Sequence, residues 1–482
     1  MEKESLKEKT AKGLLWGGLA NGMQQVIGIV FGIILGRLLS QPDYGMIAMT
    51  AVFIAVATSL QESGFRAALT NLRDPQDRDY NSVFWFNISV GTGLYALLFV
   101  CAPLIGRYYH TDKIVPLCRY ASLSIVLSSL GTAQFAYLFK NLRAKQQAKA
   151  SILSTAVSSV VGVTMAFMGM SYWSLATQSL VFVGMNTLLM WHYSPWRPSV
   201  HGITFAPVRR MFRFSFKLLA TNIIINVNNN ILNILLGRHF TPHDVGNYNQ
   251  AYQWTSKCYY VVQGMVSQVS QPTLVGLGDD RARQLNALRK MVRFTAFVCC
   301  PLLFGFGLVC REFIVLTITE KWLQSAGMMQ LLCFSAITMP ISVLLSNMII
   351  SHGKSGVYFW STFCLGTLQI VTMALIWPFG IYAMVVAYVV LNVAWMFVWQ
   401  LLVKRLSGYR LRDFVCDVLP FVFAAFGVMA LVHFATSMIS NLLLLLASRV
   451  FLGVALYYIV MRLCRVKMLD ECMGFILKKK VK

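Results

Sequence analysis

Amide side chains recur along the apolar stretch 214–237 at spacings that place them on one face of a helix. Five of them fall within about one third of the helix circumference, with Asn228 roughly opposite. The five are Asn222, Asn226, Asn229, Asn230 and Asn233. Amides are uncharged donors and acceptors, which suits them to an uncharged ligand with many hydrogen-bonding groups. The stripe therefore predicts a polar cavity, although interhelical packing is the better interpretation for any single Asn.

A smaller amide patch in the stretch 12–36 resembles this stripe. Asn21, Gln24 and Gln25 lie together on a helical surface, and Asn21 and Gln25 stand 201 residues before Asn222 and Asn226. We expect both stretches to line the same cavity.

Lys257, within YQWTSKCYYVVQG, is the least ambiguous cation in an apolar stretch. An anionic ligand that leaves the membrane interface needs a compensating positive charge, which such a lysine can supply. The alternative is a lysine that extends its amine to the outer surface. We favour contact with a ligand.

Glu62 and Arg66 stand four residues apart, the favoured order for a helical ion pair. The first interpretation is a structural ion pair, in which the two charges neutralise each other. The alternative hypothesis is that Glu62 binds H⁺ or Na⁺ and couples an ion gradient to transport, because a carboxylate inside an apolar stretch is costly.

Catalytic and metal-binding patterns are weak. The 11 cysteines lie mostly in apolar stretches without CxxC pairing, which indicates neither zinc nor a disulfide framework. Gly353, Lys354 and Ser355 match the end of a phosphate-binding loop, but Met348 occupies the place of its first glycine. No sizeable external loop with acid and base residues is predicted, so we expect neither an enzyme nor a bound cofactor or metal.

The elements that must position these residues are membrane spans. Of the 482 residues 57% are hydrophobic and 12% charged, and the mean hydropathy is +0.61, far outside soluble composition. A span needs about 20 apolar residues. Stretches of that kind predict an all-α polytopic protein with about fourteen spans. They are 12–36, 45–66, 82–105, 115–139, 148–170, 172–192, 214–237, 248–272, 290–310, 324–351, 356–378, 380–402, 414–437 and 440–462.

Charge predicts the orientation. The net charge is +24, but the 42 Lys and Arg lie in separate loops, which argues against nucleic acid as a partner. Most of them fall in the even-numbered loops and the two tails. Because short basic loops resist translocation, both termini are predicted to be cytoplasmic.

An internal repeat predicts two halves. Residues 35–45 read LGRLLSQPDYG and residues 236–246 read LGRHFTPHDVG. Both copies follow odd-numbered spans, so the halves should be parallel six-helix bundles related by a pseudo-two-fold axis normal to the membrane. We expect an N-terminal half at 1–200, a C-terminal half at 201–405, and an extra helix pair with a basic cytoplasmic tail at 406–482. Asp43 and Asp244 are expected to cap the helices that follow.

Several stretches together resemble the colanic acid exporter and O-antigen flippase branch of the polysaccharide transporter family, in the multidrug/oligosaccharidyl-lipid/polysaccharide exporter superfamily. They are LGRLLSQPDYG, SGFRAAL, NSVFWFNISVG, APLIGRYY, KNLRAKQQAKASILS, GMSYWSLATQSLV and LGRHFTPHDVGNYNQAYQW. The resemblance implies a fourteen-helix alternating-access flippase. Its substrate would be an undecaprenyl-pyrophosphate-linked oligosaccharide, the repeat unit of lipopolysaccharide, capsule or exopolysaccharide, moved from the cytoplasmic to the periplasmic leaflet of the bacterial inner membrane.

Two other transport functions remain open, a lipid II flippase and a cation-coupled multidrug antiporter. A drug antiporter favours a cavity richer in carboxylates and aromatic residues than this amide stripe. We expect a monomer with membrane lipid and lipid-linked oligosaccharide as partners. Coupling to H⁺ or Na⁺ and contact with a polymerase or ligase are further hypotheses.

Overall fold

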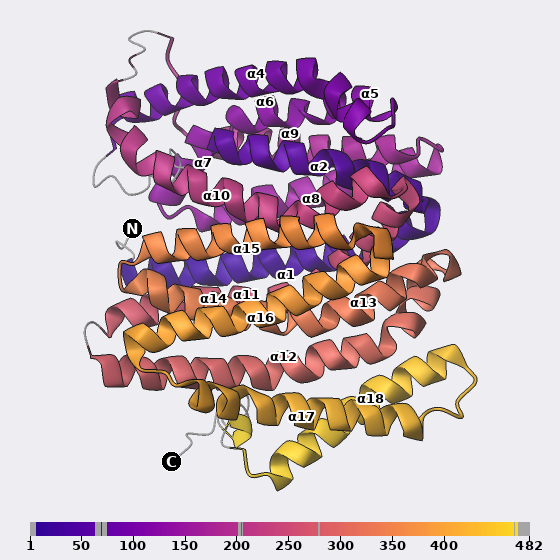
Figure 1. Ribbon diagram of the computed structural model, residues 1–482. Helices are drawn as coiled ribbons and strands as arrows, with labels where there is room; N and C mark the ends of the chain where they lie inside the picture. The colour runs from indigo at the N-terminus through magenta and orange to yellow at the C-terminus, as the bar shows by residue number, and fades with distance from the viewer. Residues whose placement is uncertain are drawn as a thin grey trace. The chain divides into compact units, whose positions relative to one another are not determined.

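The computed structural model describes residues 6–62, 69, 75–200, 204, 206–277, 280–466 and 468–470. Within these ranges the side chains of 6–15, 62, 206–221, 268, 269, 271 and 272 lie outside the description. The described residues form helices joined by turns and short loops, and none of them belongs to a strand (Figure 1). The expected all-α class is confirmed.

The chain divides into two compact units, residues 1–246 and 247–482, each described here by itself. The helices of the first unit are α1 (Leu6–Leu38), α2 (Gln41–Glu62), α4 (Asp77–Tyr108), α5 (Ile114–Ala121), α6 (Leu123–Ser129), α7 (Thr132–Lys140), α8 (Ala144–Phe167), α9 (Tyr172–Tyr193) and α10 (Ala206–His239). The division of the chain at 200 and 405 stays a prediction.

Helix α11 (Pro242–Gly276) begins at the end of the first unit and continues into the second. The other helices of the second unit are α12 (Arg281–Ile318), η1 (Glu320–Trp322), α13 (Leu323–Ala336), α14 (Thr338–Ser351), α15 (Ser355–Ile376), η2 (Trp377–Phe379), α16 (Ile381–Ser407), α17 (Leu411–Ala435) and α18 (Leu442–Leu463).

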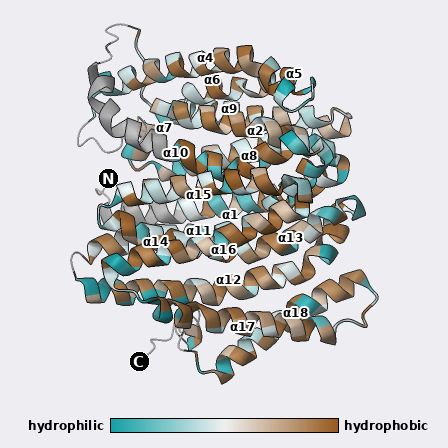
Figure 2. Cartoon of the chain, in the orientation of Figure 1, coloured by the Kyte–Doolittle hydropathy of each residue, from teal (hydrophilic) through white to brown (hydrophobic). Residues whose placement is uncertain are grey.

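Each predicted span coincides with one helix or one broken helix. In the described part of the chain, 10 helices are long and apolar enough to cross a membrane, or 11 if α5 to α7, bent by 41°, count as one span. Helices α9, α10 and α11 also coincide with predicted spans, and α10 and α11 are more polar. Hydrophobic residues predominate along most of the described helices, and hydrophilic ones are frequent at helix ends and in loops (Figure 2). The protein is a multi-pass membrane protein.

Polar residues set several helix ends. Asn441 precedes α18, and its side chain accepts hydrogen bonds from the amides of Leu443 and Leu444 at 3.1 and 3.2 Å. Such a cap satisfies amides that the first turn leaves without partners. Gly408 ends α16 in the left-handed conformation, with φ of 75°, where a side chain would be strained. These caps fix where α16 ends and α18 begins.

Helix α12 is the central element of the second unit. It packs against α13, α17 and α18, which run alongside it in Figure 1. The buried core residues Leu303, Ile341 and Ala425 come from α12, α14 and α17. In the first unit, Tyr80 and Phe84 of α4 pack around Trp196 with ring centroids 5.8 and 6.0 Å away. Each unit therefore has an apolar core of its own.

Candidate functional site

The amide stripe of α10 divides into two groups. Asn226 faces α2, and its Nδ2 donates to Ser59 Oγ at 2.7 Å and to the carbonyl of Asn222 at 3.0 Å. The Nδ2 of Asn230 donates to the carbonyl of Asn226 at 2.9 Å. Asn226 therefore holds α10 against α2, and Asn230 satisfies itself within its own helix. For Asn226 the packing interpretation has direct support.

Asn222 and Asn229 are exposed on the same helix. They lie within the arc predicted for the stripe, so α10 presents amides that α2 does not cover. Asn233 is 7% exposed, and none of the described residues hydrogen-bonds to its Oδ1. A buried amide oxygen without a partner is costly. These three are the members of the stripe whose amides have capacity for a ligand.

The amide patch of α1 is also partly used in packing. Gln24 donates to Ser151 Oγ on α8, and α1 packs against α8. Asn21 is exposed and Gln25 half-buried. A methyl group added at Gly18 or Gly22 would meet nothing within 4 Å. The face of α1 that carries Asn21 is therefore open.

Lys257 lies in α11, in the second unit, and its side chain is half-buried. Its Nζ is 4.1 Å from the centroid of the Trp254 ring, a cation–π contact. Gln253, Tyr260 and Gly264 are exposed on the same face. Lys257 thus belongs to a polar helix face that also carries an amide and a phenol.

The remaining predicted pair falls outside the described part of the chain. Glu62 ends α2, but its side chain is not described, and Arg66 lies in the undescribed segment that follows.

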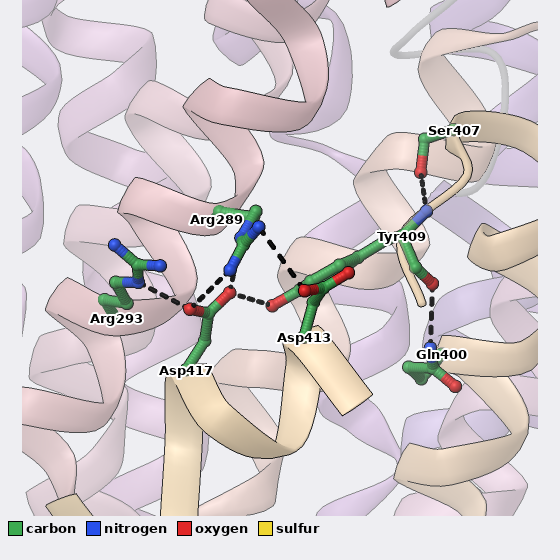
Figure 3. A network of polar contacts seen from close by, with 7 residues as sticks. All are labelled: Arg289, Arg293, Gln400, Ser407, Tyr409, Asp413 and Asp417. Atoms are coloured by element: carbon green, nitrogen blue, oxygen red, sulfur yellow. Dashed lines mark hydrogen bonds and ion pairs between the residues drawn. The ribbon is translucent and has the colours of Figure 1, made fainter. Parts of the chain in front are cut away.

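A buried ionic cluster joins α12 and α17 (Figure 3). The carboxylate of Asp417 accepts from Arg289 Nε at 2.8 Å, from Arg289 Nη2 at 3.2 Å and from Arg293 Nε at 2.5 Å. Asp417 is 1% exposed, whereas the side chains of Arg289 and Arg293 are 27% and 44% exposed. The carboxylate is therefore removed from solvent and neutralised by two arginines at the edge of the cluster.

Tyr409 completes this cluster from the segment between α16 and α17. Its hydroxyl donates to Asp417 Oδ2 at 2.8 Å, and its carbonyl accepts from Gln400 Nε2 at 2.9 Å. Burial, and then the nearby Asp417 carboxylate, raise the pKa of the Tyr409 hydroxyl well above its ordinary value. The phenol therefore stays a donor over the whole physiological range of pH.

A second buried cluster lies at the other end of the same helices. Arg449 of α18 donates to Glu312 Oε1 of α12 at 2.9 Å and to the carbonyl of Leu308 at 3.2 Å. It also donates to Thr436 Oγ1 at 3.2 Å and lies 3.3 Å from His433 Nδ1. Arg449 and Glu312 are only 8% and 5% exposed. The two clusters together fix α17 and α18 to α12.

The sequence does not signal either cluster. Asp417 and Arg289 are 128 residues apart, and Arg449 and Glu312 are 137 apart, so no helical spacing connects them. Both clusters join different helices, whereas the spacing of residues along the sequence predicts contacts within a single helix only.

The repeated loops contact each other within the first unit. A methyl group at Gly45 would overlap the carbonyl of Pro242, and one at Gly246 would overlap the carbonyl of Gln41. Asp43 and Asp244 lie in the first turns of α2 and α11, where Asp43 Oδ2 accepts from the backbone amide of Ser40 at 2.8 Å and Asp244 Oδ2 from that of Thr241 at 3.3 Å.

Known proteins resemble the chain in sequence. The family described as polysaccharide biosynthesis protein matches residues 34–327. The lipopolysaccharide biosynthesis protein WzxC of Escherichia coli (strain K12) is 24% identical over 74% of this chain and 72% of its own length. The teichuronic acid biosynthesis protein TuaB of Bacillus subtilis is 23% identical over 85% of this chain and 84% of its own.

Solved structures resemble it in fold. The lipid II flippase MurJ in an inward closed conformation has a TM-score of 0.74, with 13% identity over 96% of this chain and 99% of its own. An inward-facing multidrug resistance MATE transporter of the MOP superfamily has a TM-score of 0.62, with 13% identity over 80% of this chain and 94% of its own. The fold is thus the two-bundle fold of these transporters. Since the family match spans more than half of its residues, the chain belongs to the polysaccharide biosynthesis protein family.

Proposed function

We propose that this protein moves a lipid-linked oligosaccharide from the cytoplasmic to the periplasmic leaflet of the bacterial inner membrane by alternating access. The observation that carries the proposal is the polar face of α10, where Asn222 and Asn229 stay exposed on a helix that coincides with a predicted span. Amides on such a face can replace the water that sugar hydroxyls lose on leaving the interface. Family membership supports the same substrate class.

Lys257 would hold the pyrophosphate that links sugar and lipid. The proposal draws on its half-buried position and on its contact with Trp254. A lysine ammonium is a compact charge with three donors, which suits it to phosphate oxygens. Asn21 and Gln25 on α1 would add hydroxyl contacts.

The repeat unit of a surface polysaccharide is favoured over the two alternative substrates. A lipid II flippase and a multidrug antiporter share the fold, so the fold does not separate the three. The relatives in sequence are named for lipopolysaccharide, teichuronic acid and succinoglycan biosynthesis or transport. The amide-rich α10 also suits a hydroxyl-bearing headgroup better than a drug.

Orientation and energy coupling complete the proposal. Both termini would lie in the cytoplasm, because the basic residues concentrate on that side. Glu62, which stands four residues before Arg66 in the sequence, would bind H⁺ or Na⁺ and couple the gradient. Replacing Glu62 by Gln should then abolish ion-driven flipping, and flipping that persists unchanged would remove this coupling role. The protein would act as a monomer, with a polymerase or ligase receiving the product.

The test is a deletion strain complemented with variants of Lys257. Deletion should leave completed undecaprenyl-linked repeat units in the cytoplasmic leaflet, and the wild-type gene should restore surface polysaccharide. Lys257→Met should fail to restore it, Lys257→Arg should restore part, and Lys354→Met, at an exposed turn, should restore all. Unchanged lipid-linked pools together with altered drug tolerance would overturn the proposal in favour of an antiporter.

A further inference from the structure

The first unit contains a cavity of about 620 Å³ at one end of its helices. Four connections and their adjoining helix ends form its walls: Ser40, Pro42 and Asp43 where α2 begins, His110 to Lys113 between α4 and α5, Ser171 and Tyr172 at the start of α9, and Pro242 at the start of α11. This volume is within the range of small-molecule sites, about 300–1,000 Å³. The predicted orientation places it on the periplasmic side.

The cavity wall is polar and carries both signs of charge. Asp43 and Asp112 supply carboxylates, while Lys113 and His110 supply nitrogen donors or acceptors. Asp112, Lys113 and His110 are exposed, so their side chains can reach a ligand. Mixed charge disfavours a simple anion or cation, since each would meet a group of its own sign. The wall fits a neutral ligand with many hydrogen-bonding groups.

An aromatic ring lies beside these polar groups. The half-buried Tyr172 lines the cavity, and its ring centroid is 5.5 Å from that of Trp173. The neighbouring Trp173 supports the tyrosine ring, whose face is apolar while its hydroxyl is polar. A sugar ring has the matching combination, with a face of C–H groups and a rim of hydroxyls. Carboxylate, cation and aromatic face together therefore select a carbohydrate.

Buried hydrogen bonds hold the walls in place. Asp43 is 7% exposed and accepts from Ser40 and from Ser171, which joins two of the four connections. Arg238 Nη1 donates to the carbonyl of Tyr108 and lies 2.8 Å from His110 Nε2. The lining residues His110 and Ser171 have φ of 54° and 52°, a conformation that costs free energy in residues other than glycine. The cavity is thus pre-formed at some cost.

We propose that this cavity binds a sugar ring of the translocated oligosaccharide on the periplasmic side, with Tyr172 stacking on the ring and Asp112 accepting from its hydroxyls. The inference rests on the proposed function. Pro242 lines the cavity and also contacts Gly45 through its carbonyl. A sugar bound here therefore favours the state in which the two repeated loops touch.

The experiment uses the full-length protein in lipid nanodiscs. The probe is the oligosaccharide released by mild acid from the undecaprenyl-linked pool of the producing strain, and binding is measured by calorimetry and saturation-transfer NMR. Tyr172→Ala should weaken binding at least about tenfold, and Asp112→Asn by several fold. The matched controls are Tyr458→Ala, an exposed tyrosine of α18, and Glu320→Gln, an exposed carboxylate in η1. Both should bind as the wild type does.

Equal binding by the wild type and both cavity variants, or no saturable binding by the wild type, would overturn the inference. Thermal unfolding of each variant checks its folding, and Asp112→Asn, at an exposed position, provides the test if Tyr172→Ala does not fold. A leaflet assay on the same proteins separates the two proposals. Wild-type flipping without binding in the cavity removes the cavity alone, whereas binding without flipping of the lipid-linked substrate removes the proposed function.

Discussion

Gly45 and Gly246 make reciprocal contacts. Gly45 lies against the carbonyl of Pro242, and Gly246 lies against the carbonyl of Gln41. The two glycines are 201 residues apart, and so are Gln41 and Pro242. The glycine of each repeat therefore contacts the equivalent residue of the other repeat, Pro242 or Gln41. Such a reciprocal contact is expected where two copies of a repeat meet around a local two-fold axis. The repeat found in the sequence is thus realised as a physical interface.

Alanine at either glycine should disrupt this interface. The added methyl group would overlap backbone atoms, which cannot rotate away as a side chain can. We expect Gly45→Ala and Gly246→Ala each to lower the free energy of unfolding by about 1–3 kcal/mol and to reduce polysaccharide export. The double variant should lose little more than either single one, because both disrupt the same contact. Thermal unfolding and surface polysaccharide are the measurements.

Gly93→Ala on α4 is the control for this prediction. A methyl group there would meet nothing within 4 Å, so neither stability nor export should fall. If only one of the two loop glycines proves sensitive, the reciprocal contact is not what holds the loops together.

Local apolar content predicted the helices well. Every predicted span coincides with a helix because apolar length is a property of adjacent residues. The sequence did not predict where α12 ends. The predicted span 290–310 stops before Arg311 and Glu312, whereas α12 continues to Ile318. Glu312 can stay inside because Arg449 neutralises it, and no local pattern announces that partner.

In the candidate site, too, the sequence predicted local features but not contacts between distant residues. Periodicity placed the five asparagines on one face of α10, but it could not say what covers that face. Ser59 of α2 covers Asn226 and leaves Asn222 and Asn229 exposed. Which residues pack and which remain open depends on tertiary neighbours, so residue type and spacing alone gave a stripe rather than a site.

Asp417→Asn should destabilise the second unit. The substitution removes the charge of a buried carboxylate that accepts from Arg289, Arg293 and Tyr409, while the two arginines stay partly solvated, so we expect a loss of about 2 kcal/mol in the free energy of unfolding. Asp413→Asn is the matched control, because its carboxylate is 40% exposed and lies 3.7 Å from Arg289. It should cost under about 1 kcal/mol. Unfolding temperatures in nanodiscs compare the two, and equal losses would contradict the role of burial.

Tyr409→Phe should show a pH-dependent difference from the wild type. Near neutral pH the variant lacks one hydrogen bond to Asp417, at a cost of about 1.5 kcal/mol. The pKa of Tyr409 is raised in the folded protein, first by burial and then by Asp417. Its contribution is therefore fully present below the ordinary tyrosine pKa of about 10 and is lost as pH rises toward the folded pKa.

The measurement follows the gap in unfolding temperature between the two proteins from about pH 8 to about pH 11, a range that spans the ordinary tyrosine pKa of about 10. Contributions from other tyrosines are common to both proteins and cancel. The gap should narrow above about pH 10. A gap that stays constant across the range would show that Tyr409 ionises equally in both states.

Glu312 and Arg449 should behave as one unit in a double-mutant cycle. Glu312→Gln or Arg449→Met alone leaves an uncompensated charge in a buried site and should cost about 3–5 kcal/mol. The double variant should cost much less than the two single losses together, since no buried charge remains. Strict additivity of the unfolding free energies would mean that the two side chains are not coupled.

The amides of α10 should separate into packing and transport residues. Asn226→Ala removes the bond to Ser59, so it should lower stability by about 0.6 kcal/mol, the average for a hydrogen bond between membrane helices. Asn222→Ala and Asn229→Ala remove exposed amides, so they should leave the unfolding temperature unchanged and lower the rate of export. Ser59→Ala should reproduce the stability loss of Asn226→Ala, because it removes the same bond from the other side. Export that survives loss of both exposed amides would exclude Asn222 and Asn229 as transport residues.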